Sequence, residues 1–298
     1  MKENKNYRIL WIISFFVIVS FWLLLGSTLI NIYSNLSYSL DNNNNFFNSE
    51  IYNYIGANIP FLSMWLGFYF CFKYINNIKI SKLINSKTSI DVKLFTRVFI
   101  FSITFFIVVI LIGALLNLYD LEFIENKWVE RLILIPITLI LTPLQVIAEE
   151  ILFRAVILKI IIKDYDALTN KKKTLLHSII ISLLVGIIFI IPHLYNPEVD
   201  SNFISAISYY LLFGSLATFS ILVTSGLEIA IAIHLANNFA ITFFSTYENS
   251  ALTSIPLFIE RNEINGAKYF EVFCLLLLFV IIAIRERNKI KAYLSQKQ

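Results

Sequence analysis

The chain has 298 residues, of which 58% are apolar and 15% are charged, and its mean hydropathy is +0.74. This composition excludes an ordinary soluble domain, in which about 25% of residues are charged. The only two cysteines, Cys71 and Cys274, lie in apolar runs, so neither a disulfide framework nor a cysteine-ligated zinc site is expected.

Apolar runs of about 18 residues or more indicate membrane-spanning helices. In chain order, eight such runs cover residues 9–33, 52–74, 98–118, 132–158, 175–195, 203–224, 226–246 and 267–284. No separate soluble domain fits between them. The sequence therefore predicts an all-α fold: a polytopic transmembrane helix bundle that forms a single membrane domain over residues 1–298.

Basic residues are distributed unevenly between the two sides of this bundle. With the N-terminus placed in the cytoplasm, 19 of the 24 Lys and Arg residues fall on cytoplasmic segments and four on the opposite side. Lys and Arg near span ends favour the cytoplasmic face. We therefore predict a multi-pass cell-membrane protein with both termini cytoplasmic. The net charge of +4 then reflects an inner surface that suits the anionic lipid bilayer, and no nucleic-acid partner is expected.

The fourth run contains three ionisable residues: Glu149, Glu150 and Arg154. Such groups cost on the order of 3 kcal/mol each at membrane depth, which makes them functional candidates. Glu150 and Arg154 are four residues apart and share a helical face, so an ion pair is predicted. Glu149 is rotated by about 100° from Glu150. No basic residue lies at helical spacing from it, so we expect its partner in another span.

Two of the three histidines lie in apolar runs with a partner at helical spacing. In FIIPH, Phe189 and His193 are four residues apart, and in HLANN, His234 and Asn238 are four residues apart. Each pair can project from one face of its helix. His177 follows a lysine-rich stretch at a span boundary and is not expected in a site.

A glutamate, two histidines and an asparagine that meet between helices can form a hydrolytic centre. Glu149 can act as general base toward water, and an Asn238 amide can donate to the oxyanion formed at a scissile carbonyl. His193 and His234 can hold the attacking water or bind a metal as neutral imidazoles. Alternatively, each buried group taken alone can be a structural residue that ties helices together.

EEILFR, FIIPH and HLANN, in this order across three spans, resemble the three motifs of the CPBP intramembrane proteases. This family includes type II CAAX prenyl endopeptidases and bacterial Abi and bacteriocin-processing or immunity proteins. The resemblance covers a catalytic core of about 130–246, which leaves 1–120 and 265–298 as additional spans and tails. Ala155 stands where the family often has glycine, and we expect little effect on the chemistry.

Carried over by position, the resemblance implies a role for each motif residue. Glu149 activates water, Glu150 and Arg154 support it, and the remaining site residues are His193, His234 and Asn238. His193, His234 and Glu149 are also the candidate ligands of a Zn²⁺ ion. A glutamate cannot easily be sole base and full ligand together, so the family leaves both a metalloprotease and a glutamate-dependent protease open.

The predicted function is an intramembrane endopeptidase that hydrolyses a peptide bond in a membrane-associated peptide or protein. The alternative is a non-catalytic bacteriocin-immunity protein or an ion- or peptide-binding membrane protein. Other intramembrane proteases are disfavoured, since the sequence has no HExxH, GxGD or GxSxG motif.

The depths of the two histidines conflict in this prediction. At a rise of about 1.5 Å per residue, His234 lies about 12 Å into its span, whereas His193 lies about 30 Å beyond Lys173. Three arrangements can bring them together: a fifth helix that projects into the cytoplasm, a strong tilt, or a break at Pro192. We expect Glu149, His193 and His234 to line one cavity.

Overall fold

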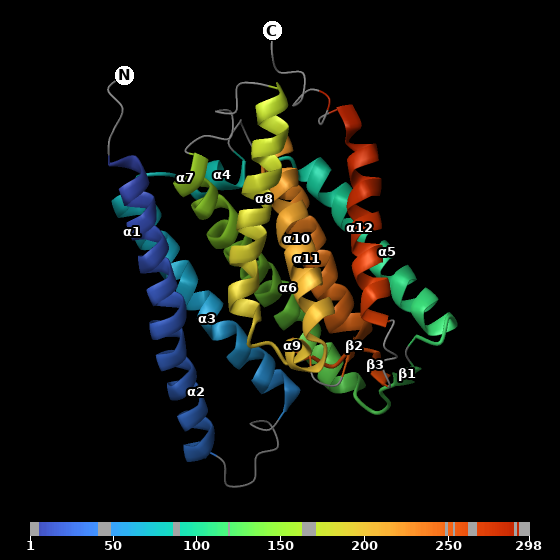
Figure 1. Ribbon diagram of the computed structural model, residues 1–298. Coiled ribbons are helices and arrows are strands. Elements are labelled where there is room, and N and C mark those ends of the chain that lie inside the picture. Colours follow the sequence, from blue (N-terminus) through green and yellow to red (C-terminus); the bar gives the residue numbers. More distant parts are fainter. Residues whose placement is uncertain are drawn as a thin grey trace.

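The computed structural model describes residues 6–40, 49–85, 90–118, 120–162, 171–247, 250–252, 254–261, 267–288 and 291. These residues form a helix bundle with a small sheet at one end (Figure 1). The helices are α1 (Tyr7–Ser20), α2 (Gly26–Leu40), α3 (Glu50–Phe70), α4 (Ile80–Ile84), α5 (Val92–Leu115), α6 (Trp128–Glu150), α7 (Ile157–Ile162), α8 (Lys171–His193), α9 (Pro197–Ser201), α10 (Phe203–Thr224), α11 (Glu228–Phe239) and α12 (Ala267–Arg285). π-helical segments directly follow α1, α3, α6 and α11, at Phe21–Leu25, Cys71–Ile75, Ile151–Val156 and Ala240–Phe244.

The apolar runs of the sequence are helical in the structure. Among the described residues, six helices are long and apolar enough to cross a membrane: Tyr7–Leu36, Glu50–Ile75, Val92–Leu115, Trp128–Ile162, Leu175–His193 and Phe203–Thr224. They coincide with the first six predicted spans. The seventh run forms the shorter apolar helix Glu228–Phe244, and the eighth forms α12. The predicted helical membrane bundle is thus confirmed, while the count of eight crossings stays a prediction.

The first turn of α1 and the last turn of α12 lie at the same end of the bundle (Figure 1). This arrangement agrees with termini on one side of the membrane. Which side faces the cytoplasm stays a prediction from the charge bias.

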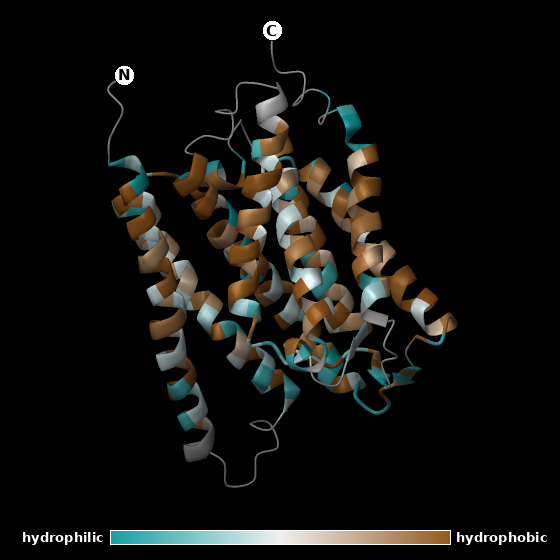
Figure 2. Ribbon diagram, viewed as in Figure 1, coloured by the Kyte–Doolittle hydropathy of each residue, from teal (hydrophilic) through white to brown (hydrophobic). Residues whose placement is uncertain are grey.

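Large apolar side chains cover the outside of the helices, as expected for a surface that contacts lipid. Figure 2 shows hydrophobic residues along the middle of the helices and hydrophilic residues gathered near α9 and the strands. Exposed examples on different helices are Leu24, Leu115, Leu132, Ile187 and Phe273. Because lipid does not drive apolar surfaces together, tight packing and polar contacts must hold the interior together.

The helices α8 and α10 pack closely along their length. A Cβ atom added to Gly214 would lie 2.9 Å from the Cα of Gly186, and one added to Gly186 would lie 2.3 Å from Ser215 Oγ. Glycine at these two positions therefore allows the backbones to approach, as small residues do in membrane helix pairs. The close approach also brings the end of α8 against the side chains of α10.

A three-stranded sheet closes the end of the bundle near α9 (Figure 1). Its strands are β1 (Asp120–Phe123), β2 (Ser245–Tyr247) and β3 (Phe258–Arg261), in the order β1-β3-β2. The strand β3 pairs antiparallel with β1, Asp120 opposite Arg261, and parallel with β2, Ser245 opposite Phe258. The sequence did not predict this sheet, because strands of three or four residues carry no alternating pattern.

Arg131 ties this end of the bundle together. Its side chain is buried. Its Nε and Nη2 donate to the carbonyl of Pro256 at 3.1 and 2.8 Å, and Nη2 also donates to the carbonyl of Ile124 at 2.7 Å. The guanidinium lies 4.9 Å from the Trp128 ring centroid. One arginine on α6 therefore holds the segments that flank β1 and β3.

We expect Arg131→Met to loosen the sheet while leaving the helices folded. Hydrogen bonds to charged groups contribute about 1.5–3 kcal/mol each, and the substitution keeps the apolar stem. Hydrogen exchange at the amides of β1 and β3 should accelerate, while exchange in α10 should not change. Unchanged protection of both strands would show that Arg131 does not hold them.

Candidate active site

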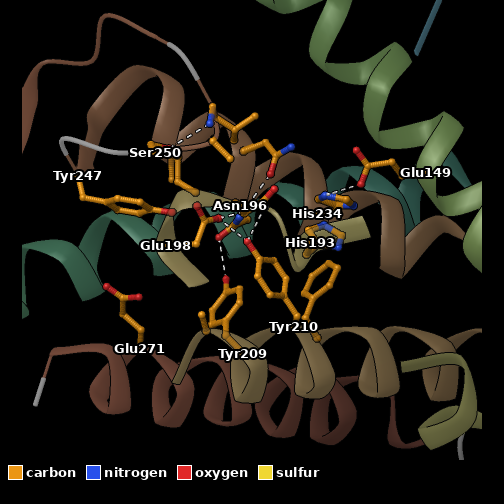
Figure 3. A pocket seen from close by; sticks show the side chains of 18 of the residues that line it. Glu149, His193, Asn196, Glu198, Tyr209, Tyr210, His234, Tyr247, Ser250 and Glu271 are labelled. Carbon is orange, nitrogen blue, oxygen red and sulfur yellow. Dashed lines mark hydrogen bonds and ion pairs between the residues drawn. The ribbon is translucent and has the colours of Figure 1, made fainter. Parts of the chain in front are cut away.

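A cavity of about 350 Å³ lies inside the bundle and extends to the sheet. Glu149, His193, His234 and Asn238 all line it, although they come from α6, α8 and α11 (Figure 3). Apolar side chains from α3, α5 and α10 form much of the remaining wall. The structure therefore brings the four residues of the predicted hydrolytic centre to one cavity.

Glu149 is buried and has two different neighbours. Gln145 Nε2 donates to Glu149 Oε1 at 3.2 Å, and His234 Nε2 lies 3.8 Å from Glu149 Oε2 (Figure 3). The expected partner from another span is thus His234, while Gln145 is a second partner one helical turn earlier on the same helix. The 3.8 Å separation is longer than a direct hydrogen bond and suits a contact through water.

Glu150 lies at the centre of a fully buried polar cluster. Arg154 Nη1 donates to Glu150 Oε1 at 2.6 Å, which is the predicted ion pair. The same oxygen accepts from His234 Nδ1 at 2.7 Å, a contact that the sequence did not predict. Glu150 therefore binds both Arg154, four residues later in the chain, and His234 on α11.

This contact decides which nitrogen of His234 faces the cavity. A carboxylate only accepts, so Nδ1–H donates to Glu150, and in the neutral imidazole Nε2 is then left with a lone pair. Nε2 is the atom that faces Glu149. A carboxylate behind a histidine is a common way to fix the orientation of a working imidazole.

Arg154 is held on its other side by aromatic rings. Its guanidinium carbon lies 4.3 Å from the Phe189 ring centroid and 5.3 Å from the Phe213 ring centroid. Arginine over an aromatic face is stabilised by the negative ring face, and the effect grows when water is excluded. The arginine thus links the π-helical segment after α6 to α8 and α10 behind the cavity.

The helix changes its geometry immediately after the two glutamates. Ile151–Val156 is π-helical, and Arg154 and Ala155 lie within it. The sequence interpretation assumed a regular α-helix through this motif. π-helical turns occur often at functional sites, where the extra residue per turn redirects side chains.

His193 is the last residue of α8, and the helix continues through Pro192 without a break. Its Nδ1 donates to the carbonyl of Phe189 at 2.7 Å. The ring centroid lies 4.4 Å from that of Phe189 and 4.3 Å from that of Tyr210. His193 is therefore fixed by one hydrogen bond and two rings, and its Nε2 is available to a ligand.

The depth conflict is resolved by the ends of the helices. The first turns of α8 extend beyond the neighbouring ends of α10 and α11 (Figure 1). The helix α11 also begins below the surface, since Glu228 is buried and accepts from Asn85 Nδ2 at 2.8 Å and from the Asp91 amide at 2.9 Å. The segment that contains Asn85 and Asp91 therefore covers the start of the helix that carries His234.

Asn238 lies one turn after His234 on α11 and is buried. The amide of Asn237 donates to its Oδ1 at 3.4 Å. The exposed His177 does not line the cavity. Asn238 therefore lines the cavity and His177 does not, in agreement with the sequence prediction.

The cavity contains polar residues that sequence reasoning missed. Beyond Gln145 they include Asn196, Glu198, Tyr209, Tyr210, Asn237, Tyr247, Glu260 and Glu271. Only Gln145 carried a usable signal, its four-residue spacing from Glu149. Burial raises the pKa of Tyr247 well above its usual value, and the charge of Glu198 raises it further, so this hydroxyl stays protonated. No Lys or Arg is among the described lining residues, so they offer no counter-ion to an anionic ligand.

A bound metal is not supported by the donor arrangement. Within the described ranges, no three His, Cys, Asp or Glu side chains gather closely enough to hold a metal ion. The proposed ligands Glu149, His193 and His234 share a cavity but do not form such a set.

Residues 130–240 match a family model described as type II CAAX prenyl endopeptidase Rce1-like. The match supports membership of the CPBP family. The CPBP-like segment is less than half of the chain, but it includes every predicted site residue. "Uncharacterized protein YyaK" of Bacillus subtilis (strain 168) is 33% identical over 123 residues, which are 41% of this chain and 38% of that relative. No solved structure matches the chain.

The predicted resemblance to CPBP proteases is thus confirmed over this segment. The apolar helices indicate a multi-pass membrane protein, and residues 130–240 resemble a protease family.

Proposed function

We propose that this protein is an intramembrane endopeptidase that cleaves a membrane-associated peptide or protein with Glu149 as general base. The observation that carries the proposal is the facing pair of Glu149 Oε2 and His234 Nε2, 3.8 Å apart in a cavity between apolar helices. This pair lies in the segment that matches a protease family. A buried carboxylate beside an oriented imidazole is suited to bind and activate water.

The hydrogen-bond acceptors that face the cavity suggest how the attacking water is held and activated. Nε2 of His234 and Oε2 of Glu149 are both acceptors, so one water can donate a hydrogen bond to each and direct its oxygen lone pair at a scissile carbonyl. Glu149 takes the proton as the oxygen–carbon bond forms. It then delivers that proton to the amine nitrogen as the carbon–nitrogen bond breaks. His193 Nε2 is an alternative acceptor for one of the two water hydrogens.

Asn238 supplies the donor that the intermediate needs. Both histidines already use Nδ1–H, for Glu150 and for the Phe189 carbonyl, so neither neutral ring can donate into the cavity. The Asn238 amide can donate to the oxyanion of the tetrahedral intermediate. Removal of such a donor typically lowers kcat by about 10²- to 10³-fold.

Comparative peptidomics of membranes tests this proposal. We expect peptides released by the wild-type protein to be absent with Glu149→Ala and with His234→Ala. His177→Ala, an exposed histidine outside the cavity, is the matched control and should leave the peptide pool unchanged. All variants are compared at equal membrane abundance. Identical peptide pools for wild type and Glu149→Ala would instead support the non-catalytic binding or immunity function.

A further inference from the structure

Two adjacent tyrosines of α10, Tyr209 and Tyr210, lie against the candidate active site and belong to separate hydrogen-bond networks (Figure 3). Consecutive residues of a helix are about 100° apart, so one helix can direct two side chains to different partners. Neither tyrosine belongs to the three motifs. Both line the cavity.

Tyr210 supports His193. The ring centroids are 4.3 Å apart with an interplanar angle of 34°. The Tyr210 hydroxyl donates to Glu198 Oε1. The amide of Asn196 donates to the Tyr210 hydroxyl at 2.9 Å and to Glu198 Oε1 at 3.2 Å. The phenol is therefore anchored at its tip and cannot swing away from the imidazole.

His193 depends on this anchor for its orientation. The hydrogen bond to the Phe189 carbonyl fixes Nδ1, but it leaves the ring free to rock about that contact. Phe189 covers one part of the ring at 4.4 Å, and Tyr210 covers another. The two aromatic contacts together fix the direction of Nε2.

Tyr209 supports Asn238 through Asn237. The Tyr209 hydroxyl donates to Asn237 Oδ1 at 2.9 Å. This bond fixes the Asn237 side-chain oxygen toward Tyr209, so its Nδ2 points away from Tyr209. That amide donates to Asn238 Oδ1 at 3.4 Å. With its oxygen engaged, Asn238 keeps its own amide hydrogens for the cavity, as an oxyanion donor requires.

We propose that Tyr209 and Tyr210 are positioning residues: Tyr210 with Glu198 holds His193, and Tyr209 through Asn237 sets the amide orientation of Asn238. The inference rests on the proposed peptidase function. It extends the site from the three motifs to α10 and α9. Neither tyrosine takes part in bond making or breaking.

Tyr209→Phe and Tyr210→Phe test the inference, because each removes only a hydroxyl. The probe is a quenched-fluorescent peptide that carries the cleavage site found by peptidomics. We expect kcat to fall on the order of 10-fold to 100-fold in each variant, with little change in KM, as for a misplacement of about 1 Å. Ser208→Ala, on the same helix outside the cavity, is the matched control and should leave kcat unchanged.

Double variants separate positioning from a general structural role. Tyr209→Phe should have no further effect in Asn238→Ala, and Tyr210→Phe should have none in His193→Ala, because each tyrosine acts through that residue. Additive losses would overturn the inference. An unchanged kcat in both single variants would do the same.

Nuclear magnetic resonance of isotope-labelled histidine gives a readout that needs no substrate. The chain has only three histidines. Tyr210→Phe should shift or broaden the His193 signals and leave those of His177 unchanged, while Tyr209→Phe should leave His193 unchanged. Unaltered His193 signals in Tyr210→Phe would contradict its role. If the Glu149→Ala protein still cleaved the peptide, the proposed peptidase mechanism would be wrong, whatever the results with the tyrosine variants.

Discussion

Replacing Glu149 by glutamine is expected to lower peptide hydrolysis by about 10²- to 10⁴-fold, the usual contribution of a general base. Glutamine has nearly the same shape and can still accept from Gln145 and hold a water, but it cannot take a proton. The abundance and thermal stability of the protein should therefore be maintained. The measurement is turnover of the quenched-fluorescent peptide by purified protein in detergent or lipid.

Glu130→Gln is the matched control for this substitution. Glu130 lies at the other end of α6, its side chain is 35% exposed, and it forms an ion pair with Lys127. The same chemical change there should leave turnover unaltered. Full turnover in Glu149→Gln would exclude this glutamate as the base.

Replacing Arg154 by methionine is expected to destabilise the whole bundle. Arg154 and Glu150 are both fully buried, and removal of one partner leaves a charge in a poorly solvated interior. Such losses cost about 3–5 kcal/mol. The variant should show a lower thermal unfolding midpoint in detergent and a lower yield of inserted protein.

A charge-neutral double variant isolates the cause of this loss. Glu150→Gln combined with Arg154→Met removes the stranded carboxylate, and the new amide oxygen can still accept from His234. It should regain part of the lost stability. Arg97→Met breaks the pair in which Arg97 is 59% exposed and Glu286 is 9% exposed, and it should cost less stability than Arg154→Met because the arginine lies largely in solvent. If Arg154→Met proved as mild as Arg97→Met, the buried pair would not stabilise the bundle.

The membrane helices could be predicted because lipid imposes a simple rule on the sequence. A segment that satisfies its backbone internally in a bilayer must be helical, long and apolar, and this requirement is visible in composition alone. The run from 203 to 224 predicts α10 to the residue. The run from 226 to 246 contains the shorter helix Glu228–Phe244, and Glu228 at its start is buried.

The candidate site could be located in the sequence because ionisable groups are rare in apolar runs. Glu149, Glu150 and Arg154 stand out on that ground, and the four-residue spacing predicted the ion pair that the structure contains. The same spacing could have identified Gln145. Their proposed roles in catalysis stay predictions until the variants are measured.

Contacts between distant segments had no local signature. The bond from His234 to Glu150 joins residues 84 positions apart, and the choice of Glu150 over Glu149 for Nδ1 depends on how α11 packs against α6. Likewise, Tyr209 and Tyr210 look like ordinary aromatic residues of a membrane span. Their partners on α9 and α11 become neighbours only after the helices pack.

By itself, the sequence determined that this chain is a helical membrane protein. It also determined which few buried polar residues could form a site, because a charged residue in an apolar run is visible within that one segment. Only the tertiary structure decided which partner each polar atom has, which imidazole nitrogen faces the cavity, and that a short sheet closes one end. Those features depend on the positions of several helices at once, so no single segment encodes them.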